Sequence, residues 1–355
     1  AMTLGGAAVA VLAIGGAAAY QVARAVPTPS PVAPTAAAQP STWVLGLQLP
    51  AARTGLAAVA AGGDVYVIGG AGDGGRLISQ TLRYAGDGGL DWQPRAPKPT
   101  AVRDVGAAVV QGRIVVPGGC GADGTAVDRV EIYDPRSDRW TAGAPLPPGR
   151  AVCGYGIAAL DGQVFVFGGR TGAGADSATD AVLRYDPGAD AWTLEPDRLL
   201  RPRADLAAAS FDDRDRIHLV GGRSPGGAVE RSHWVYRPFA AAAERWDESA
   251  AALPEGRAGH ALAAATSPGE HLYLVGGGFD RHLDVGTLTF DVERDAWTPY
   301  AVVRGYTPDR GAALAILGRQ QLMLVGGQRQ TGEPLRQTYL RPLKYEILLP
   351  SGGQR

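Results

Sequence analysis

Six arginines recur at similar places in a repeating pattern, each just ahead of a run of small residues: Arg53, Arg103, Arg150, Arg203, Arg257 and Arg310. A guanidinium group presents a planar fork of donors that matches a carboxylate, so arginines gathered at one centre could grip an acidic ligand. The structural alternative is that each guanidinium bonds loop carbonyls of a neighbouring unit. The repetition favours the structural interpretation, and both alternatives stay open for each arginine.

Other chemistry-bearing residues indicate no catalytic centre. None of the five histidines has a metal-ligand spacing with a carboxylate partner: His218, His233, His260, His271 and His282. The chain carries no G-x-S-x-G, P-loop or C-x-x-C motif. Its net charge of −1 provides no global field that would recruit nucleic acid. We therefore expect no enzymatic activity, no cofactor, no metal and no nucleic-acid partner.

A short apolar run ended by two glycines positions these residues, and the chain repeats it six times. The six runs begin at Val65, Ile114, Val164, Ile217, Leu272 and Leu322. The first glycines of successive pairs lie 49, 50, 53, 55 and 50 residues apart. Each run predicts a buried strand, and each glycine pair predicts a turn with positive φ or a close backbone approach. A period near fifty indicates one propeller blade per unit.

The remainder of each unit repeats as well. An aromatic residue, usually followed by Asp, precedes a tryptophan by at most eleven residues: Tyr84 and Trp92, Tyr133 and Trp140, Tyr185 and Trp192, Tyr236 and Trp246, Phe290 and Trp297. The intervening Asp-Pro or polar residues predict a tight turn, which places each pair on two outer strands of a hairpin. Four strands per unit and six units predict an all-β, six-bladed propeller.

Together, the paired glycines, the Tyr-Asp-Pro turn, the tryptophan and the Leu-Pro-x-x-Arg segment resemble the Kelch repeat over residues 43–349. The resemblance implies the propeller fold and says little about function, because Kelch propellers include binding modules and a few enzymes. The chain lacks the Tyr-His pair that a resemblance to the copper-containing Kelch oxidases would require.

The chain is expected to have three parts. Residues 3–25 are apolar up to Val22 and long enough to span a bilayer, which predicts a transmembrane anchor. The alternative is a cleaved signal peptide ending at the small-x-small sequence Ala23-Arg24-Ala25. Residues 26–42 form a Pro/Ala-rich linker, and residues 43–349 form the propeller, which we expect on the periplasmic or extracellular side. The blades are expected at about 49–92, 93–140, 141–192, 193–246, 247–297 and 298–349, the last completed by 43–47.

Two features predict links between blades: a strand that closes the ring, and a disulfide between adjacent blades. Trp43 lies 49 residues before Trp92, in phase with the tryptophan series, so residues 43–47 are expected to supply the outermost strand of the last blade. Cys120 follows the second glycine pair and Cys153 begins the next unit, so both should lie on one face in adjacent blades. We expect a disulfide between them, with two free thiols as the alternative.

The long connections of an up-and-down blade emerge on one face, and we expect a partner to bind there. The candidate residues on this face are Arg53, Arg103, Arg150, Arg170, Arg203, Arg223, Arg257, Phe279, Arg281, His282, Arg310 and Gln328. Phe279 is the strongest single candidate, because an aromatic side chain in a Gly-rich loop has no evident role in folding.

The sequence therefore predicts a membrane-anchored Kelch-type propeller that serves as a protein-interaction or accessory subunit of a larger membrane or cell-envelope complex. The alternative is a periplasmic carbohydrate-active propeller enzyme of the sialic-acid epimerase or mutarotase type, for which Glu230 and Arg231, in the loop after the fourth glycine pair, are the candidate residues. The structural interpretation of these two residues is a solvated pair of loop side chains. Acidic residues and arginines that converge at the mouth of the axis would favour the enzyme. A broad loop face of mixed polarity, without a convergent pocket, would favour the interaction module.

Overall fold

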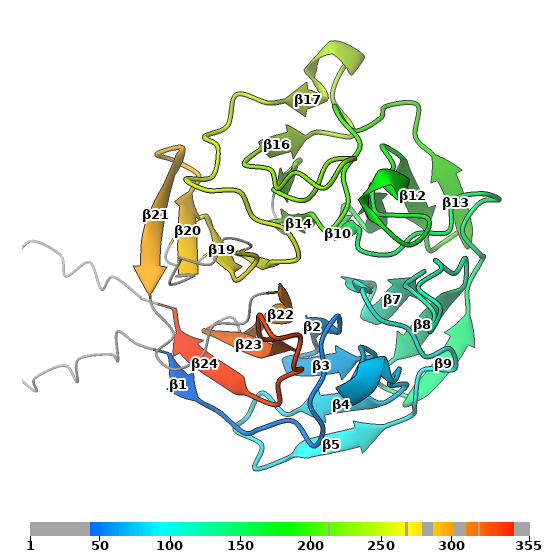
Figure 1. Cartoon of the computed structure of the whole chain (residues 1–355), viewed down its shortest axis with the longest axis vertical. Helices are drawn as coiled ribbons and strands as arrows, with labels where there is room; N and C mark the ends of the chain where they lie inside the picture. The colour runs from blue at the N-terminus through cyan, green and yellow to red at the C-terminus, as the bar shows by residue number, and fades with distance from the viewer. Residues whose placement is uncertain are drawn as a thin grey trace, which may run out of the picture. The chain divides into compact units, whose positions relative to one another are not determined.

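The computed structural model describes residues 43–211, 214–266, 269–278, 287–301, 310–318 and 320–343. These residues form six antiparallel sheets of four strands each. Figure 1 shows the sheets arranged around a central axis, with β2, β10, β14 and β22 near the centre and β5, β9, β13, β17 and β21 at the rim. The all-β, six-bladed fold expected from the repeats is confirmed.

The expected membrane segment, residues 3–25, and the linker, residues 26–42, lie outside the described residues. Within the described part of the chain, no helix has the length and apolar character needed to cross a membrane.

The strands follow each sheet from the axis outwards, and three 3-10 turns lie in the connections. The elements are β2 (Ala57–Ala61), β3 (Asp64–Ile68), η1 (Asp73–Gly75), β4 (Thr81–Tyr84), β5 (Trp92–Arg95); β6 (Ala108–Val110), β7 (Arg113–Pro117), β8 (Val130–Asp134), β9 (Arg139–Ala142); β10 (Gly156–Leu160), β11 (Gln163–Phe167), η2 (Ala175–Ser177), β12 (Val182–Asp186), β13 (Ala191–Leu194); β14 (Ala207–Ser210), β15 (Ile217–Val220), β16 (His233–Tyr236), η3 (Ala242–Glu244), β17 (Trp246–Asp247); β18 (Ala261–Ala265), β19 (His271–Val275), β20 (Thr287–Asp291), β21 (Ala296–Ala301); β22 (Arg310–Leu317), β23 (Gln321–Gln328), β24 (Thr338–Pro342) and β1 (Val44–Leu45).

The second strand of each sheet carries the core, because its side chains are buried on both faces. The apolar residues of β3, β7, β11, β15, β19 and β23 pack against the neighbouring blades. The glycine pair that ends each strand is required by space as well as by conformation. Gly70 has φ of +95°, and a Cβ there would lie 2.8 Å from the carbonyl oxygen of Thr54. Any side chain at this position would clash with the inner segment of its own blade.

The outer hairpins form as the aromatic pattern predicts. Tyr133 lies directly opposite Trp140 across β8 and β9, and the other aromatic–tryptophan pairs have the same register. Trp140 Nε1 donates to the carbonyl of Ala96 at 2.8 Å, in the connection from the preceding blade. Trp92, Trp192 and Trp297 make the equivalent bond. The tryptophans therefore tie neighbouring blades together at the rim.

The first described strand closes the ring. β1 pairs antiparallel with β24, so the last sheet has the order β1-β24-β23-β22, and Figure 1 shows β1 beside β24. Trp43 is buried and donates from Nε1 to Thr287 Oγ1 of the fifth sheet at 3.1 Å. The sequence thus located the strand correctly, although the ladder covers only Val44 and Leu45 of the expected 43–47.

Backbone hydrogen bonds encircle the axis, one between each pair of adjacent blades. The equivalent positions all have positive φ and are Gly55, Asp104, Gly154, Asp205, Gly259 and Gly311. Gly154 N donates to Asp104 O at 2.7 Å, and Asp205 N donates to Gly154 O at 2.6 Å. The series continues through Gly259 and Gly311 to Gly55, and the sixth bond, from Val105 N to Gly55 O, is the longest at 3.5 Å. This ring frames the candidate site.

Candidate functional site

A pocket of about 310 Å³ opens on the axis directly at this backbone ring. Its lining combines four arginines and two aspartates with small neutral residues: Thr54, Arg103, Asp104, Arg170, Gly174, Ala204, Asp205, Arg223, Gly259, Arg310, Gly311 and Gln328. The lining residues come from all six blades, the fifth contributing only Gly259, so the closed ring is what brings them together. The lining residues carry a net charge of +2, since four cations face two carboxylates.

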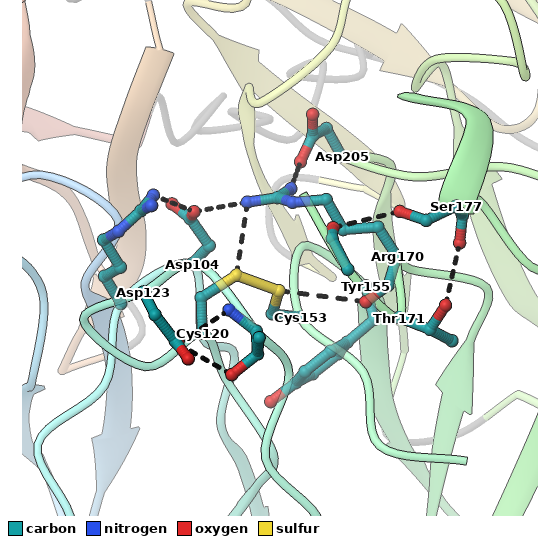
Figure 2. The surroundings of a disulfide bond; sticks show 12 residues. Asp104, Cys120, Asp123, Cys153, Tyr155, Arg170, Thr171, Ser177 and Asp205 are labelled. Atoms are coloured by element: carbon teal, nitrogen blue, oxygen red, sulfur yellow. Dashed lines mark hydrogen bonds and ion pairs between the residues drawn. A yellow bond between two sulfur atoms is a disulfide. The ribbon is translucent and has the colours of Figure 1, made fainter. Parts of the chain in front are cut away.

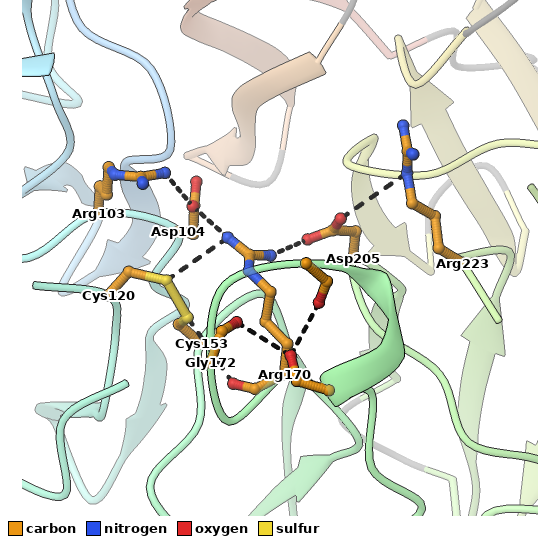
Figure 3. Close-up of polar contacts among 10 residues, drawn as sticks. Arg103, Asp104, Cys120, Cys153, Arg170, Gly172, Asp205 and Arg223 are labelled. Carbon is orange, nitrogen blue, oxygen red and sulfur yellow. Dashed lines mark hydrogen bonds and ion pairs between the residues drawn. A yellow bond between two sulfur atoms is a disulfide. The ribbon is translucent and has the colours of Figure 1, made fainter. Parts of the chain in front are cut away.

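Five of the charged residues form one alternating chain around part of the axis (Figure 3). Arg103 Nη1 lies 2.6 Å from Asp104 Oδ2, and Arg170 bonds the same carboxylate through Nη2. Arg170 Nη1 lies 2.5 Å from Asp205 Oδ1, and Arg223 Nε lies 3.9 Å from Asp205 Oδ2. Arg170 is the centre of the chain because its fork bridges two carboxylates from different blades.

Burial and ion pairing shift the pKa values of Asp205 and Arg170 in opposite directions. Burial raises the pKa of the Asp205 carboxyl, although Arg170 and Arg223 partly offset this effect. Burial lowers the pKa of Arg170, but the two neighbouring carboxylates outweigh it and the net direction is upward. Arg170 therefore stays cationic, and Asp205 is the pocket carboxylate whose charge burial opposes most directly.

Asp104 and Asp205 are functional candidates that the sequence reasoning missed. They have φ of 51° and 53°, at ring positions where the other four blades have glycine. Aspartate tolerates this conformation better than most non-glycine residues, so the ring can present a carboxylate at these two positions, and the contacts of both carboxylates with Arg170 make them candidates. The sequence signal for these two candidates is an Asp where four of the six units have Gly. It becomes visible only when the units are aligned on their ring positions.

The opposite side of the pocket is formed by Arg310, Gln328 and Thr54. With the Gln328 amide oriented so that its oxygen faces Arg310, this oxygen accepts from Arg310 Nε at 2.7 Å and from Nη2 at 3.1 Å. The amide nitrogen then donates to Thr54 Oγ1 at 3.2 Å. The neutral amide of Gln328 thus helps to orient the Arg310 guanidinium.

Three of the six repeated arginines follow the structural interpretation that the repetition favours. Arg53, Arg203 and Arg257 are only 0%, 1% and 4% exposed. Arg53 Nη2 donates to Gln80 Oε1 at 2.6 Å, Arg257 Nη1 approaches the Gly276 carbonyl, and Arg203 Nη1 lies 3.1 Å from Glu230 Oε1. These partners belong to the glycine pair or the connection that follows it in the same blade, not to a neighbouring blade as expected.

Register explains the difference between the two groups of arginines. Arg103 precedes ring residue Asp104 by one position, and Arg310 precedes Gly311 by one, whereas Arg53 precedes Gly55 by two. A shift of one residue in an extended segment moves the side chain to the other face. In the third blade the position equivalent to Arg103 is held by Cys153, so Arg150 lies outside the pocket lining.

Of the other residues expected on the partner face, three line the pocket and three lie outside the described residues. Arg170, Arg223 and Gln328 line the pocket. Phe279, Arg281 and His282 lie outside the described residues. Among described residues that the sequence considered for catalysis, Glu230 pairs with buried Arg203, and Arg231 Nε donates to the Leu253 carbonyl at 2.7 Å. Neither residue faces the axial pocket.

Cys120 and Cys153 form a disulfide beside the pocket, with an S–S distance of 2.01 Å and a Cα–Cα distance of 5.3 Å (Figure 2). The bond joins the end of the second blade's second strand to the first segment of the third blade. Arg170 Nη2 lies 3.5 Å from Cys120 Sγ. The disulfide therefore contacts the central cation of the charge chain directly.

Comparisons with known proteins agree with this architecture. The Kelch motif matches residues 101–147 and 151–198. The chain is 29% identical to Kelch-like protein 35 of Mus musculus, over 56% of this chain and 32% of that protein. It is 26% identical to Kelch-like protein terF of Aspergillus terreus, over 89% of this chain and 69% of that protein. The chain thus spans about a third of the first relative and about two thirds of the second.

A solved structure has the same fold. The structure of YjhT superposes with a TM-score of 0.67 at 16% identity, covering 82% of this chain and 95% of YjhT. At this level of identity the similarity concerns the fold alone.

Proposed function

The chain is a six-bladed β-propeller built of Kelch repeats, and from this premise we propose that it is a binding module that holds its partner through an acidic group seated in the axial pocket. The observation that carries the proposal is the convergence of Arg103, Arg170, Arg223 and Arg310 on one pocket with a net charge of +2. Arginine forks fixed by neighbouring carboxylates and an amide are already oriented, so little side-chain entropy is lost on binding.

The partner in this proposal is a protein, in keeping with the wide use of Kelch propellers for protein binding. A pocket of about 310 Å³ has room for a single acidic side chain or a terminal carboxylate. The proposed setting, a membrane or cell-envelope complex on the outer side, comes from the apolar sequence of residues 3–25.

The pocket is tested with citrate as a compact carboxylate probe. Isothermal titration at low, fixed ionic strength is expected to show binding that Arg223→Gln and Arg310→Gln each weaken about tenfold, the loss expected for one charge-assisted contact. Matched controls are Arg136→Gln and Asp161→Asn, in the short turns outside the pocket lining. Equal citrate affinity in the pocket variants and the controls would contradict the proposal.

A second experiment addresses the protein partner. The full chain is purified from native membranes in mild detergent, as the original protein, as the Arg223→Gln/Arg310→Gln double variant and as Arg136→Gln. We expect one or more proteins to accompany the original chain and the Arg136 control but not the double variant. Loss of the same proteins from the control would show that the pocket is not the contact.

A second candidate function is catalysis on an acidic sugar, because acidic residues and arginines do converge at the axis. Asp205 is the specific observation in its favour, since burial raises the pKa of this carboxyl, and a carboxyl with a raised pKa can act as a proton donor or acceptor. The test is anomer exchange of N-acetylneuraminate followed by NMR. If the protein accelerates anomer exchange and Asp205→Asn abolishes the acceleration, the protein is an enzyme. If exchange with the protein is no faster than in buffer alone, the binding function stands.

A further inference from the structure

We infer that the Cys120–Cys153 disulfide sets the spacing of two pocket arginines, so that thiol redox state controls binding in the axial pocket. The inference rests on the proposed function, because it concerns regulation of the same pocket. Both sulfur atoms belong to fully buried residues, yet one of them contacts the arginine at the centre of the charge chain.

Each cysteine is the β-bridge partner of one pocket arginine. Arg103 bridges Cys120, with N–O distances of 3.0 and 2.7 Å in the two directions. Cys153 bridges Arg170, with distances of 3.0 and 2.8 Å. The disulfide therefore joins two short ladders, and each ladder holds one arginine at the pocket. Figure 3 shows the two arginines meeting at Asp104, with the sulfur atoms below.

The charge chain depends on this spacing. Asp104 accepts from Arg103 and from Arg170, which come from the second and third blades. Each of these bonds requires the two arginines to stay within reach of one carboxylate. A covalent link between their bridge partners restricts how far the two segments can separate, so it favours the arrangement in which both forks are already oriented.

Arg170 also lies between the pocket and the sulfur atoms. Its side chain is 15% exposed, whereas Cys120 and Cys153 have no exposed surface. A reductant that enters through the pocket must displace Arg170 before it can reach Cys120. A carboxylate bound to Arg170 would hold this cover in place. By reciprocity, a ligand that shifts the thiol–disulfide equilibrium towards the disulfide binds more tightly to the disulfide form.

The redox step is an exchange with a dithiol. One reductant thiolate attacks a protein sulfur, the Cys120–Cys153 bond breaks, and the second reductant thiol resolves the mixed disulfide. Two protons and two electrons pass to the two cysteines, and the reductant leaves as a disulfide. The freed sulfurs move to non-bonded distance, and Cys120 Sγ, which accepts from Arg170 Nη2 in the disulfide, can then move away from this guanidinium. Both changes disfavour the bridged arrangement at Asp104.

The first test compares citrate binding to the oxidised protein, the dithiothreitol-reduced protein and the Cys120→Ser/Cys153→Ser variant. If the competent arrangement falls to about a third of molecules, citrate binds about threefold more weakly to both thiol-free and reduced forms. Using reduced original protein alongside the variant keeps the test valid if the serine variant folds poorly. Identical dissociation constants in the oxidised and reduced protein would overturn the inference.

The second test measures the rate of disulfide reduction rather than a dissociation constant. The rate of disulfide reduction by dithiothreitol is followed by mass spectrometry in the original protein, in Arg170→Gln and in the Asp161→Asn control. We expect faster reduction in Arg170→Gln, the original rate in the control, and slower reduction of the original protein with citrate. If citrate fails to bind the oxidised protein, the proposed function fails, whereas an unchanged rate in Arg170→Gln overturns the redox coupling itself.

Discussion

Two buried histidines make the stability of the fourth blade sensitive to acid. His218 Nδ1 lies 2.9 Å from His233 Nε2, and His233 Nδ1 lies 3.3 Å from the carbonyl oxygen of Ala251. The arrangement fits two neutral rings, in which His218 donates to His233 and His233 donates to Ala251. Burial lowers the pKa of His218 to about 3 and that of His233 to about 4.

Because both pKa values are below the unfolded value near 6.5, the unfolded chain binds more protons between pH 6.5 and pH 4. Stability from this pair is complete above pH 6.5 and decreases as the pH falls. Between pH 7 and pH 4.5, we expect the free energy of unfolding of the His218→Phe/His233→Phe variant to fall by about 5 kcal/mol less than that of the original protein. Ala251 keeps Trp297 as a donor in this variant. Parallel pH profiles in urea unfolding would refute the assignment.

Lys98 is one of two lysines in a chain rich in arginine, and it is buried with Glu131. Its Nζ lies 2.5 Å from Glu131 Oε2, while Thr100 supplies backbone and hydroxyl donors to the same carboxylate. Burial is the largest influence on the Lys98 pKa and lowers it. The pair links the connection after β5 to β8.

Lys98→Met leaves the Glu131 carboxylate buried without its cation, and we expect a loss of about 3 kcal/mol in the free energy of unfolding. The Lys98→Met/Glu131→Gln double variant removes both charges and should recover most of this loss. Chemical denaturation of the two variants at pH 7 measures the difference. A double variant no more stable than Lys98→Met would show that packing, rather than the unpaired charge, determines the cost.

At the scale of elements, we expect β1, although only two residues long, to contribute strongly to the thermal stability of the propeller. Trp43 bonds Thr287 of the fifth sheet, and Gly46 N donates to Thr338 O of the last blade. We expect deletion of residues 1–48 to lower the melting temperature by about 10 °C or more, from the loss of one buried tryptophan and one strand. Deletion of residues 1–38 removes none of these contacts and serves as the control. Equal melting temperatures of the two deletion variants would show that residues 39–48 do not stabilise the closed ring.

The elements that the sequence predicted well share one property: their signals are local. The apolar run with its glycine pair, and the aromatic–tryptophan hairpin, each depend on residues close in sequence, so the period identifies them directly. The arginines resisted prediction because Arg53 and Arg103 differ by one residue of register relative to the ring. That single residue separates a buried loop anchor from a pocket residue, and a nearly regular spacing does not reveal it.

At the scale of the whole molecule, the pocket exists only because the ring closes. Residues 54 and 328 face each other across the last seam, while Asp104 and Asp205 meet through Arg170 from blades two apart. No single blade contains the charge pattern, so its composition could be predicted only after the six units were aligned on their ring positions. Asp104 and Asp205 then stand out as the two departures from glycine.

The encircling hydrogen bonds provide a test of this dependence. Each axial bond joins two blades, so breaking one requires relative movement of neighbouring blades, and we expect the six amides to exchange with solvent at similar, slow rates. The Trp43→Ala variant removes the hydrogen bond to Thr287 of the fifth sheet and the packing of the indole in the core between the fifth and sixth blades. We expect hydrogen exchange to accelerate at Gly311 and Gly55, which bond across the last two seams, and to change least at Asp205. Exchange that accelerates equally at all six positions would show instead that the propeller opens as one cooperative unit.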